Sequence, residues 1–200
     1  MKKLPTIFTR LKIKMSAALK ENPANNSLMT ANDVADFCAL MEKENIEIVV
    51  DGGWCVDALL GRQLRLHKDL DIALQWKDVP RLRQILSAQG FKQIKEDSQW
   101  NFVLADNLGH EIDVHAFVYG GNGNVVDGIM YPAVSLTGKG TIEGCAINCI
   151  TPGYMVEFLA PWISKWPQKY LPAVSGLCAK FNIPLPKEYR EFMNPKDSRS

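Results

Sequence analysis

The clearest pattern in the chain is a two-residue alternation of apolar and polar positions, which occurs at residues 69–74 and 111–117. In DLDIAL and EIDVHAF, aliphatic residues alternate with acidic or small ones. Because successive side chains of a strand point to opposite faces, each stretch predicts a strand with one apolar, core-facing side. The polar positions of both strands then lie together on the opposite face.

Other stretches predict further strands and intervening helices. Strands are expected at residues 46–50, 91–96, 100–106 and 145–150. Helices are expected from about residues 30, 54, 78, 152 and 168. The Gly-rich stretch 118–141 reads as loop with at most one short strand. This mixture predicts the α/β (α+β) class, with one mixed β-sheet flanked by helices and a small C-terminal helical and strand part.

The chain of 200 residues is long enough for one domain with short additions. Residues 1–28 carry apolar positions at helical spacing between basic residues and end in ENPANNS, which predicts an N-terminal extension. It could bind a membrane surface or partner, or pack as an arm, and an internal start at Met29 is a further alternative. We expect the domain at 29–190 and a tail at 191–200.

Charge and cysteine content narrow the function classes. The first 20 residues hold six of the 23 basic residues and none of the 22 acidic ones, so the remainder carries a net charge of −5. An acidic body disfavours nucleic acid as a partner. The five cysteines form no CxxC or zinc pattern and read as reduced thiols, which predicts a cytoplasmic location. No apolar run is long enough for a membrane span.

Two of the polar positions in the first strand are the carboxylates Asp69 and Asp71. Their α-carbons are expected to be about 6.5–7 Å apart on one face, so both carboxylates can reach the same metal ion. Like charges at this spacing repel each other, and a divalent cation relieves the repulsion. Mg²⁺ prefers such oxygen ligands. The pair therefore predicts a Mg²⁺ site, with two solvated acids on an exposed edge strand as the alternative.

The second alternating strand places Asp113 and His115 on one face. If the two strands are neighbours, Asp113 joins the first two aspartates, as a metal ligand or as a general base for an attacking hydroxyl. For His115 we expect a core or surface position in preference to a ligand role.

Gly52 and Gly53 lie between a predicted strand and a predicted helix. Glycines at a helix N-terminus let a phosphate approach the backbone closely, although Gly-Gly is also common in ordinary turns. What makes the pair informative is the order of features, with Gly-Gly first, the DxD strand next and a distant aspartate last.

The stretch VVDGGWCVDALLGRQLRLHKDLDIAL resembles the signature of the nucleotidyltransferase superfamily, and within it the lincosamide and aminoglycoside adenylyltransferases. GHEIDVHAF and the late INCITPGYMVEFL…LCAKFNIPLPKEY resemble the lincosamide branch most. The resemblance covers about residues 30–190.

The resemblance implies an enzyme that transfers AMP from ATP, or from another nucleoside triphosphate, to a hydroxyl of a small molecule with Mg²⁺ as cofactor. It implies that the Gly-Gly pair holds the triphosphate, that the two strand aspartates bind Mg²⁺, and that Asp113 is the third carboxylate. Arg65 and His67 match basic positions expected near the phosphates, and Arg62 is a weaker candidate. Asp57 is expected to organise the loop, and Trp54 to pack in the core.

Two positions depart from the pattern of this branch. Leu159 replaces an expected histidine and Ala173 an expected acid, in a region that also carries Trp162 and Trp166. This apolar version leaves open whether the acceptor is a lincosamide or aminoglycoside antibiotic. A macromolecular acceptor on the same fold and an inactive nucleotide-binding protein stay open as alternatives, as do a monomer and a homodimer.

Overall fold

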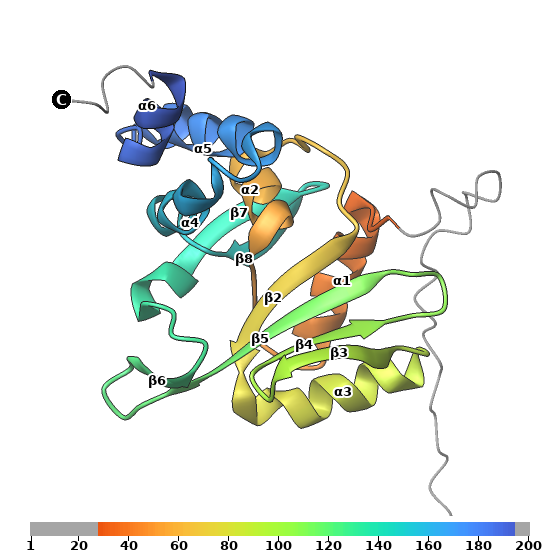
Figure 1. Cartoon of the computed structure of the whole chain (residues 1–200). Helices are drawn as coiled ribbons and strands as arrows, with labels where there is room; N and C mark the ends of the chain where they lie inside the picture. The colour runs from red at the N-terminus through yellow and green to blue at the C-terminus, as the bar shows by residue number, and fades with distance from the viewer. Residues whose placement is uncertain (1–27, 195–200) are drawn as a thin grey trace, which may run out of the picture.

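In the computed structural model, residues 28–194 are described (Figure 1). The α-helices are α1 (Ala31–Lys43), α2 (Gly52–Leu60), α3 (Val79–Ala88), α4 (Pro152–Leu159), α5 (Pro167–Phe181) and α6 (Lys187–Met193). The strands are β1 (Ile48–Val50), β2 (Asp69–Gln75), β3 (Lys92–Ser98), β4 (Asn101–Ala105), β5 (Glu111–Tyr119), β6 (Val125–Gly128), β7 (Gly138–Ile142) and β8 (Cys145–Cys149). Short 3₁₀ turns are η1 (Trp76–Asp78), η2 (Ala133–Thr137) and η3 (Ala160–Trp162).

The strands form a single mixed sheet in the order β3-β4-β5-β2-β1-β8-β7, with β6 paired to β5. The pairs β2·β5 and β1·β8 are parallel, and the other pairs are antiparallel. The predicted α/β (α+β) class with a mixed sheet is therefore confirmed. The edge strand β3 is exposed along its whole length and rich in charged residues, which protects a sheet edge from pairing with other chains.

The two alternating strands are direct neighbours at the centre of the sheet. Their apolar positions are fully buried, as in Leu70 and Ile72 of β2 and Ile112 and Val114 of β5. Burying one complete face of each strand fixes the register, because a slip of one residue would expose these side chains and bury the aspartates. Packing of the core therefore determines where the carboxylates lie.

The helices cover the sheet in two groups (Figure 1). Helix α1 lies behind the sheet and begins with a capping box between Thr30 and Asp33. Arg81 of α3 donates a hydrogen bond to Glu44, which follows α1. Helices α4 and α5 of the C-terminal part contact each other and helix α2 near the β7–β8 end of the sheet.

Several details differ from the sequence-based expectations. Helix α2 begins at Gly52, so both glycines belong to its first turn. The stretch 118–141 holds the end of β5, β6, η2 and most of β7 in place of a loop. Pro172 lies inside α5, and the additional helix α6 extends to Met193.

The extension predicted at 1–28 lies outside the described residues except for its last one. The division into 29–190 and 191–200 stays a prediction. Among residues 28–194, no helix combines the length and hydrophobicity that crossing a lipid bilayer requires.

Candidate functional site

The acidic residues of the two central strands meet because β2 and β5 are parallel and in register. Asp71 pairs directly with Asp113 across the two strands. Ligand atoms of Asp71, Asp113 and His115 all lie within 4.8 Å of one another. Oδ1 of Asp113 is buried without a hydrogen-bond partner among the described residues. A buried carboxylate oxygen without a partner, beside a second carboxylate, suits a divalent cation.

This cluster differs from the predicted set of three aspartates. Asp69 pairs with Glu111 in the register and is not part of the close cluster, although it lines the same cavity as Asp71. The third member of the cluster is His115, for which a core or surface position was expected. The signal was present in the sequence, because His115 shares a face with Asp113 in an alternating strand.

The pKa of Asp71 is strongly perturbed. Burial, with the nearby charges of Asp69 and Asp51, raises it from 3.8 to about 7. Burial also raises the pKa of Asp113, against the opposing effect of His115. Carboxylates that ionise reluctantly are typical of sites where a cation or a proton has to be taken up.

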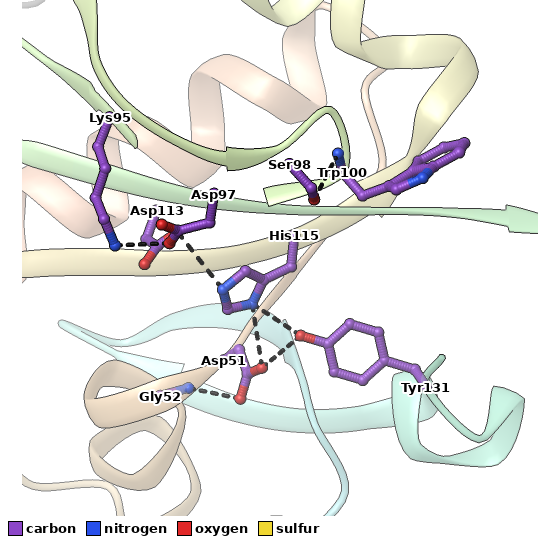
Figure 2. Close-up of polar contacts among 9 residues, drawn as sticks. All are labelled: Asp51, Gly52, Lys95, Asp97, Ser98, Trp100, Asp113, His115 and Tyr131. Atoms are coloured by element: carbon purple, nitrogen blue, oxygen red, sulfur yellow. Dashed lines mark hydrogen bonds and ion pairs between the residues drawn. The ribbon is translucent and has the colours of Figure 1, made fainter. Parts of the chain in front are cut away.

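A hydrogen-bonded network connects the cluster to the first turn of α2 (Figure 2). The Tyr131 hydroxyl donates to Oδ2 of Asp51 at 2.7 Å, and Nδ1 of His115 lies 2.9 Å from that hydroxyl. Because the hydroxyl proton goes to Asp51, Nδ1 of His115 is the donor to the hydroxyl oxygen. On the other side of the ring, Nε2 of His115 lies 3.5 Å from Oδ1 of Asp113.

In this network, Asp51 and His115 each stabilise the charged form of the other. Burial opposes ionisation of Asp51, but His115, whose Nδ1 lies 3.7 Å from Oδ2, and the hydrogen bonds from Tyr131 and Gly52 together lower its pKa. Burial likewise opposes protonation of His115, but the neighbouring carboxylates of Asp51, Asp113 and Asp71 raise its pKa. The network therefore holds the imidazole in a fixed orientation next to Asp113.

Asp51 also forms the N-cap of α2. Its Oδ1 accepts from the Gly52 amide at 2.6 Å, and its own amide donates to the backbone oxygen of Asp71 at 2.9 Å. Gly52 has a φ of +60°, and a β-carbon there would lie 1.9 Å from Oδ2 of Asp71. Only glycine therefore allows the helix N-terminus to approach the carboxylates this closely.

The predicted basic residues pack against the second glycine. A β-carbon on Gly53 would lie 2.3 Å from Nδ1 of His67 and 2.8 Å from Nη2 of Arg65. Nε2 of buried His67 is 2.6 Å from Oδ2 of Asp57, whose Oδ1 accepts from the Leu64 amide at 3.0 Å. Asp57 thus organises the loop as expected. Nδ1 of His67 has no partner among the described residues.

Trp54 is almost fully buried, with its ring centroid 4.6 Å from that of His67, which confirms the expected packing role. The weaker candidate Arg62 is exposed and does not line the cavity that contains Arg65.

Two cavities meet at the carboxylates. The first cavity, of about 170 Å³, is lined by Gly52, Gly53, Arg65, His67, Asp69, Asp71 and, from α5, Lys169. A second cavity of about 350 Å³ is lined by Asp51, His115 and Tyr131 together with apolar residues of α4 and η3. Gly52, Asp71, Leu159 and Tyr170 line both.

Sequence reasoning missed Lys169, Tyr131 and Asp51 as residues of the site. Asp51 directly precedes the glycines, so its position at a helix start was a usable signal. Tyr131 and Lys169 carried no local signal, because long-range folding alone brings them to the carboxylates.

Comparison with known proteins agrees with this geometry. The family model for aminoglycoside-2''-adenylyltransferase matches residues 33–161, which is more than half of the chain and includes both strands and the Gly-Gly turn. The chain belongs to this family. The resemblance to antibiotic nucleotidyltransferases is thereby confirmed.

This chain is also similar to a curated protein and to two solved structures. A lincosamide resistance protein of Staphylococcus haemolyticus is 33% identical over 67 residues, and the match covers 34% of this chain and 42% of that protein. The crystal structure of the lincosamide antibiotic adenylyltransferase LnuA, lincomycin-bound, aligns with a TM-score of 0.66 and 19% identity over 75% of this chain and 97% of LnuA.

The structure of ANT(2'')-Ia in complex with adenylyl-2''-tobramycin aligns with a TM-score of 0.63 and 19% identity, over 76% of this chain and 88% of that one. At this level of identity the two structures establish a shared fold. The acceptors named for them, one a lincosamide and one an aminoglycoside, are different classes of molecule.

Proposed function

We propose that the protein transfers AMP from ATP to a hydroxyl group of a small molecule, with Mg²⁺ as cofactor. The observation that carries the proposal is the parallel register of β2 and β5, which places Asp71 opposite Asp113 directly in front of the N-terminus of α2. Membership of an adenylyltransferase family supports the same reaction. We further propose that the protein acts in the cytoplasm, where ATP is available.

The triphosphate would bind in the first cavity. The first turn of α2 offers backbone amides and the positive end of the helix dipole, and Gly52 and Gly53 leave room for phosphate oxygens. Arg65, in the loop before β2, and Lys169, in α5, line the same cavity and supply positive charge. Nε2 of His67 is bonded to Asp57 and Nδ1 has no partner among the described residues, so Nδ1 is the ring atom left for a phosphate contact.

The carboxylates Asp69, Asp71 and Asp113 are the proposed ligands of Mg²⁺, and His115 lies within reach of the same position. When bound, Mg²⁺ would neutralise negative charge on the reacting phosphate. The raised pKa values of Asp71 and Asp113 agree with this role, since crowded carboxylates gain most from a cation.

In the proposed reaction, the acceptor hydroxyl oxygen forms a bond to the α-phosphorus while the bond to the pyrophosphate oxygen breaks. Asp113 would accept the hydroxyl proton, and its raised pKa brings it nearer to the operating pH. Asp51 and Tyr131 hold His115 against Asp113, so this network would orient the base. Positioning of the groups supplies much of the acceleration in such phosphoryl chemistry.

The proposal is tested by incubating the protein with Mg²⁺, ATP and either lincomycin or tobramycin, and measuring pyrophosphate and the mass of the product. We expect one adenylylated product, and a loss of at least about 100-fold in rate for Asp113→Asn, in line with removal of a general base. Asp36→Asn, an exposed change on α1, is the control and should be as active as the unchanged protein.

Absence of product with both antibiotics, while Mg²⁺-dependent ATP binding persists, would refute the antibiotic acceptors and favour a macromolecular acceptor. Absence of ATP binding would refute the proposed reaction itself.

A further inference from the structure

The second cavity has an unusually apolar wall for a site that would bind a hydroxylated acceptor. Its floor is formed by Asp51, Asp71 and His115, next to the reacting groups. The remaining wall is aromatic or aliphatic and comprises Ile129, Met130, Tyr131, Met155, Phe158, Leu159, Trp162 and Tyr170. A surface of this kind gains free energy by removing apolar ligand area from water.

Neither carboxylate of the floor is free to pair with a ligand ammonium group. Asp51 uses Oδ1 for the Gly52 amide and Oδ2 for the Tyr131 hydroxyl. Asp71 belongs to the proposed metal cluster. The other residues lining this cavity carry no acidic side chain, so an additional ligand cation would be buried without a partner, which costs free energy.

Two of the rings that line the second cavity, Trp162 and Tyr170, already have a lysine beside them. Trp162 and Trp166 stack with ring centroids 5.5 Å apart, and Nζ of Lys165 lies 4.2 Å from the Trp166 centroid and 5.7 Å from the Trp162 centroid. Nζ of Lys169 lies 5.1 Å from the Tyr170 ring centroid. Neither lysine lines the second cavity, but each ammonium group lies within cation–π distance of one of its rings and adds positive charge beside the wall.

We propose that the acceptor is a hydroxylated molecule with an apolar portion and at most one cationic group, and that Phe158, Trp162 and Tyr170 select it by contact with that portion. Polycationic acceptors are disfavoured because the residues lining this cavity offer no free carboxylate, and the lysines beside Trp162 and Tyr170 add positive charge nearby. This inference rests on the proposed function, because it assigns the second cavity to the acceptor of that reaction.

The direct test is binding, measured by calorimetry with Mg²⁺ and a non-hydrolysable ATP analogue present. Lincomycin, with a single basic nitrogen and an alkyl-substituted ring, is the probe for the proposed class, and tobramycin, with several amines, is the polycation. We expect lincomycin to bind at least about tenfold more tightly. Equal or tighter tobramycin binding overturns the inference, and so does the absence of lincomycin binding at millimolar concentration.

A pair of variants tests the wall itself. Trp162 is 46% exposed, so Trp162→Ala should leave the fold intact while it removes part of the contact area. Phe181→Ala is the matched control, because Phe181 is 37% exposed and lines neither cavity. We expect Trp162→Ala to weaken lincomycin binding about tenfold with unchanged binding of the ATP analogue, and Phe181→Ala to change neither. Equal effects of the two variants on lincomycin would overturn the inference.

The two hypotheses fail separately. The adenylylated product measured above decides the reaction, whereas selective binding decides the acceptor class. Efficient adenylylation of tobramycin would leave the reaction standing and refute the inference. Tight, Trp162-dependent lincomycin binding without any product would support the inference about the cavity and refute adenylylation of lincomycin.

Discussion

Asp71 is the residue at which the requirements of function and stability conflict most. Its carboxylate is held between Asp69 of the same strand and Asp51 at the start of α2, and its backbone oxygen accepts from the Asp51 amide. Burial and these charges raise its pKa from 3.8 to about 7. In the metal-free protein the folded state therefore binds a proton that the unfolded chain has already released.

Replacing this residue should stabilise the metal-free protein in a pH-dependent manner. Because the folded-state pKa is raised, the contribution of Asp71 is most favourable below pH 3.8 and is lost as the pH rises towards about 7. Asp71→Asn has no carboxylate to ionise, so it does not lose this contribution. The melting temperature of the variant minus that of the unchanged protein should therefore be larger at about pH 8 than at about pH 5, by roughly 3 °C or more.

Thermal unfolding with a chelator present measures this difference, and Asp36→Asn controls for the loss of one surface carboxylate. A difference in melting temperature that is the same at both pH values would contradict the assigned environment of Asp71.

The element that defines the site is the first turn of α2. Asp51 caps it, Gly52 takes a positive φ above Asp71, and Gly53 packs against His67 and Arg65. The turn is thus enclosed by side chains from β2 and from the loop before it. Its lack of β-carbons is what keeps the helix amides accessible to a phosphate.

A methyl group on Gly53 should disrupt this arrangement. In Gly53→Ala the new carbon would lie 2.3 Å from Nδ1 of His67, which is buried and fixed by Asp57, so the ring or the turn has to shift. We expect a lower melting temperature and at least about tenfold weaker binding of Mg²⁺-ATP by calorimetry.

Gly153→Ala is the matched control, because a β-carbon at that position in α4 would meet no atom within 4 Å. This variant should keep full nucleotide affinity and gain up to about 1 kcal/mol in stability from helix propensity. Equal nucleotide affinity of the two variants would argue against the proposed phosphate position.

At the scale of the whole molecule, the site exists only in the complete fold. Asp71 lies on β2, Asp113 and His115 on β5, Tyr131 after β6 and Lys169 on α5. The unfolded chain does not bring these groups together, so a cation or nucleotide bound there stabilises the entire folded state by mass action.

Mg²⁺ should therefore raise the melting temperature of the protein. At about 100 times the dissociation constant the stabilisation is about 2.7 kcal/mol, which corresponds to roughly 5–10 °C for a chain of this size. Differential scanning calorimetry with a Mg²⁺ titration provides the measurement. Asp113→Asn should show a much smaller increase, and an unchanged melting temperature of the original protein at millimolar Mg²⁺ would contradict the metal site.

The sequence by itself determined the strands, their buried faces and the chemistry that they carry. The alternation in 69–74 and 111–117 is a local property, so it predicted which side chains are buried, that Asp69 and Asp71 share the opposite face, and that His115 shares a face with Asp113. The Gly-Gly pair before a helix likewise indicated a phosphate site, because glycine has no β-carbon and lets a ligand approach the backbone closely.

Only the tertiary structure decided which of these groups meet. The parallel register of β2 and β5 brings Asp113 opposite Asp71 and leaves Asp69 outside the close cluster. Register depends on packing between strands that are about forty residues apart in the chain, and no short stretch encodes it. The same holds for Tyr131 and Lys169, which reach the site because folding places their loop and helix beside the carboxylates.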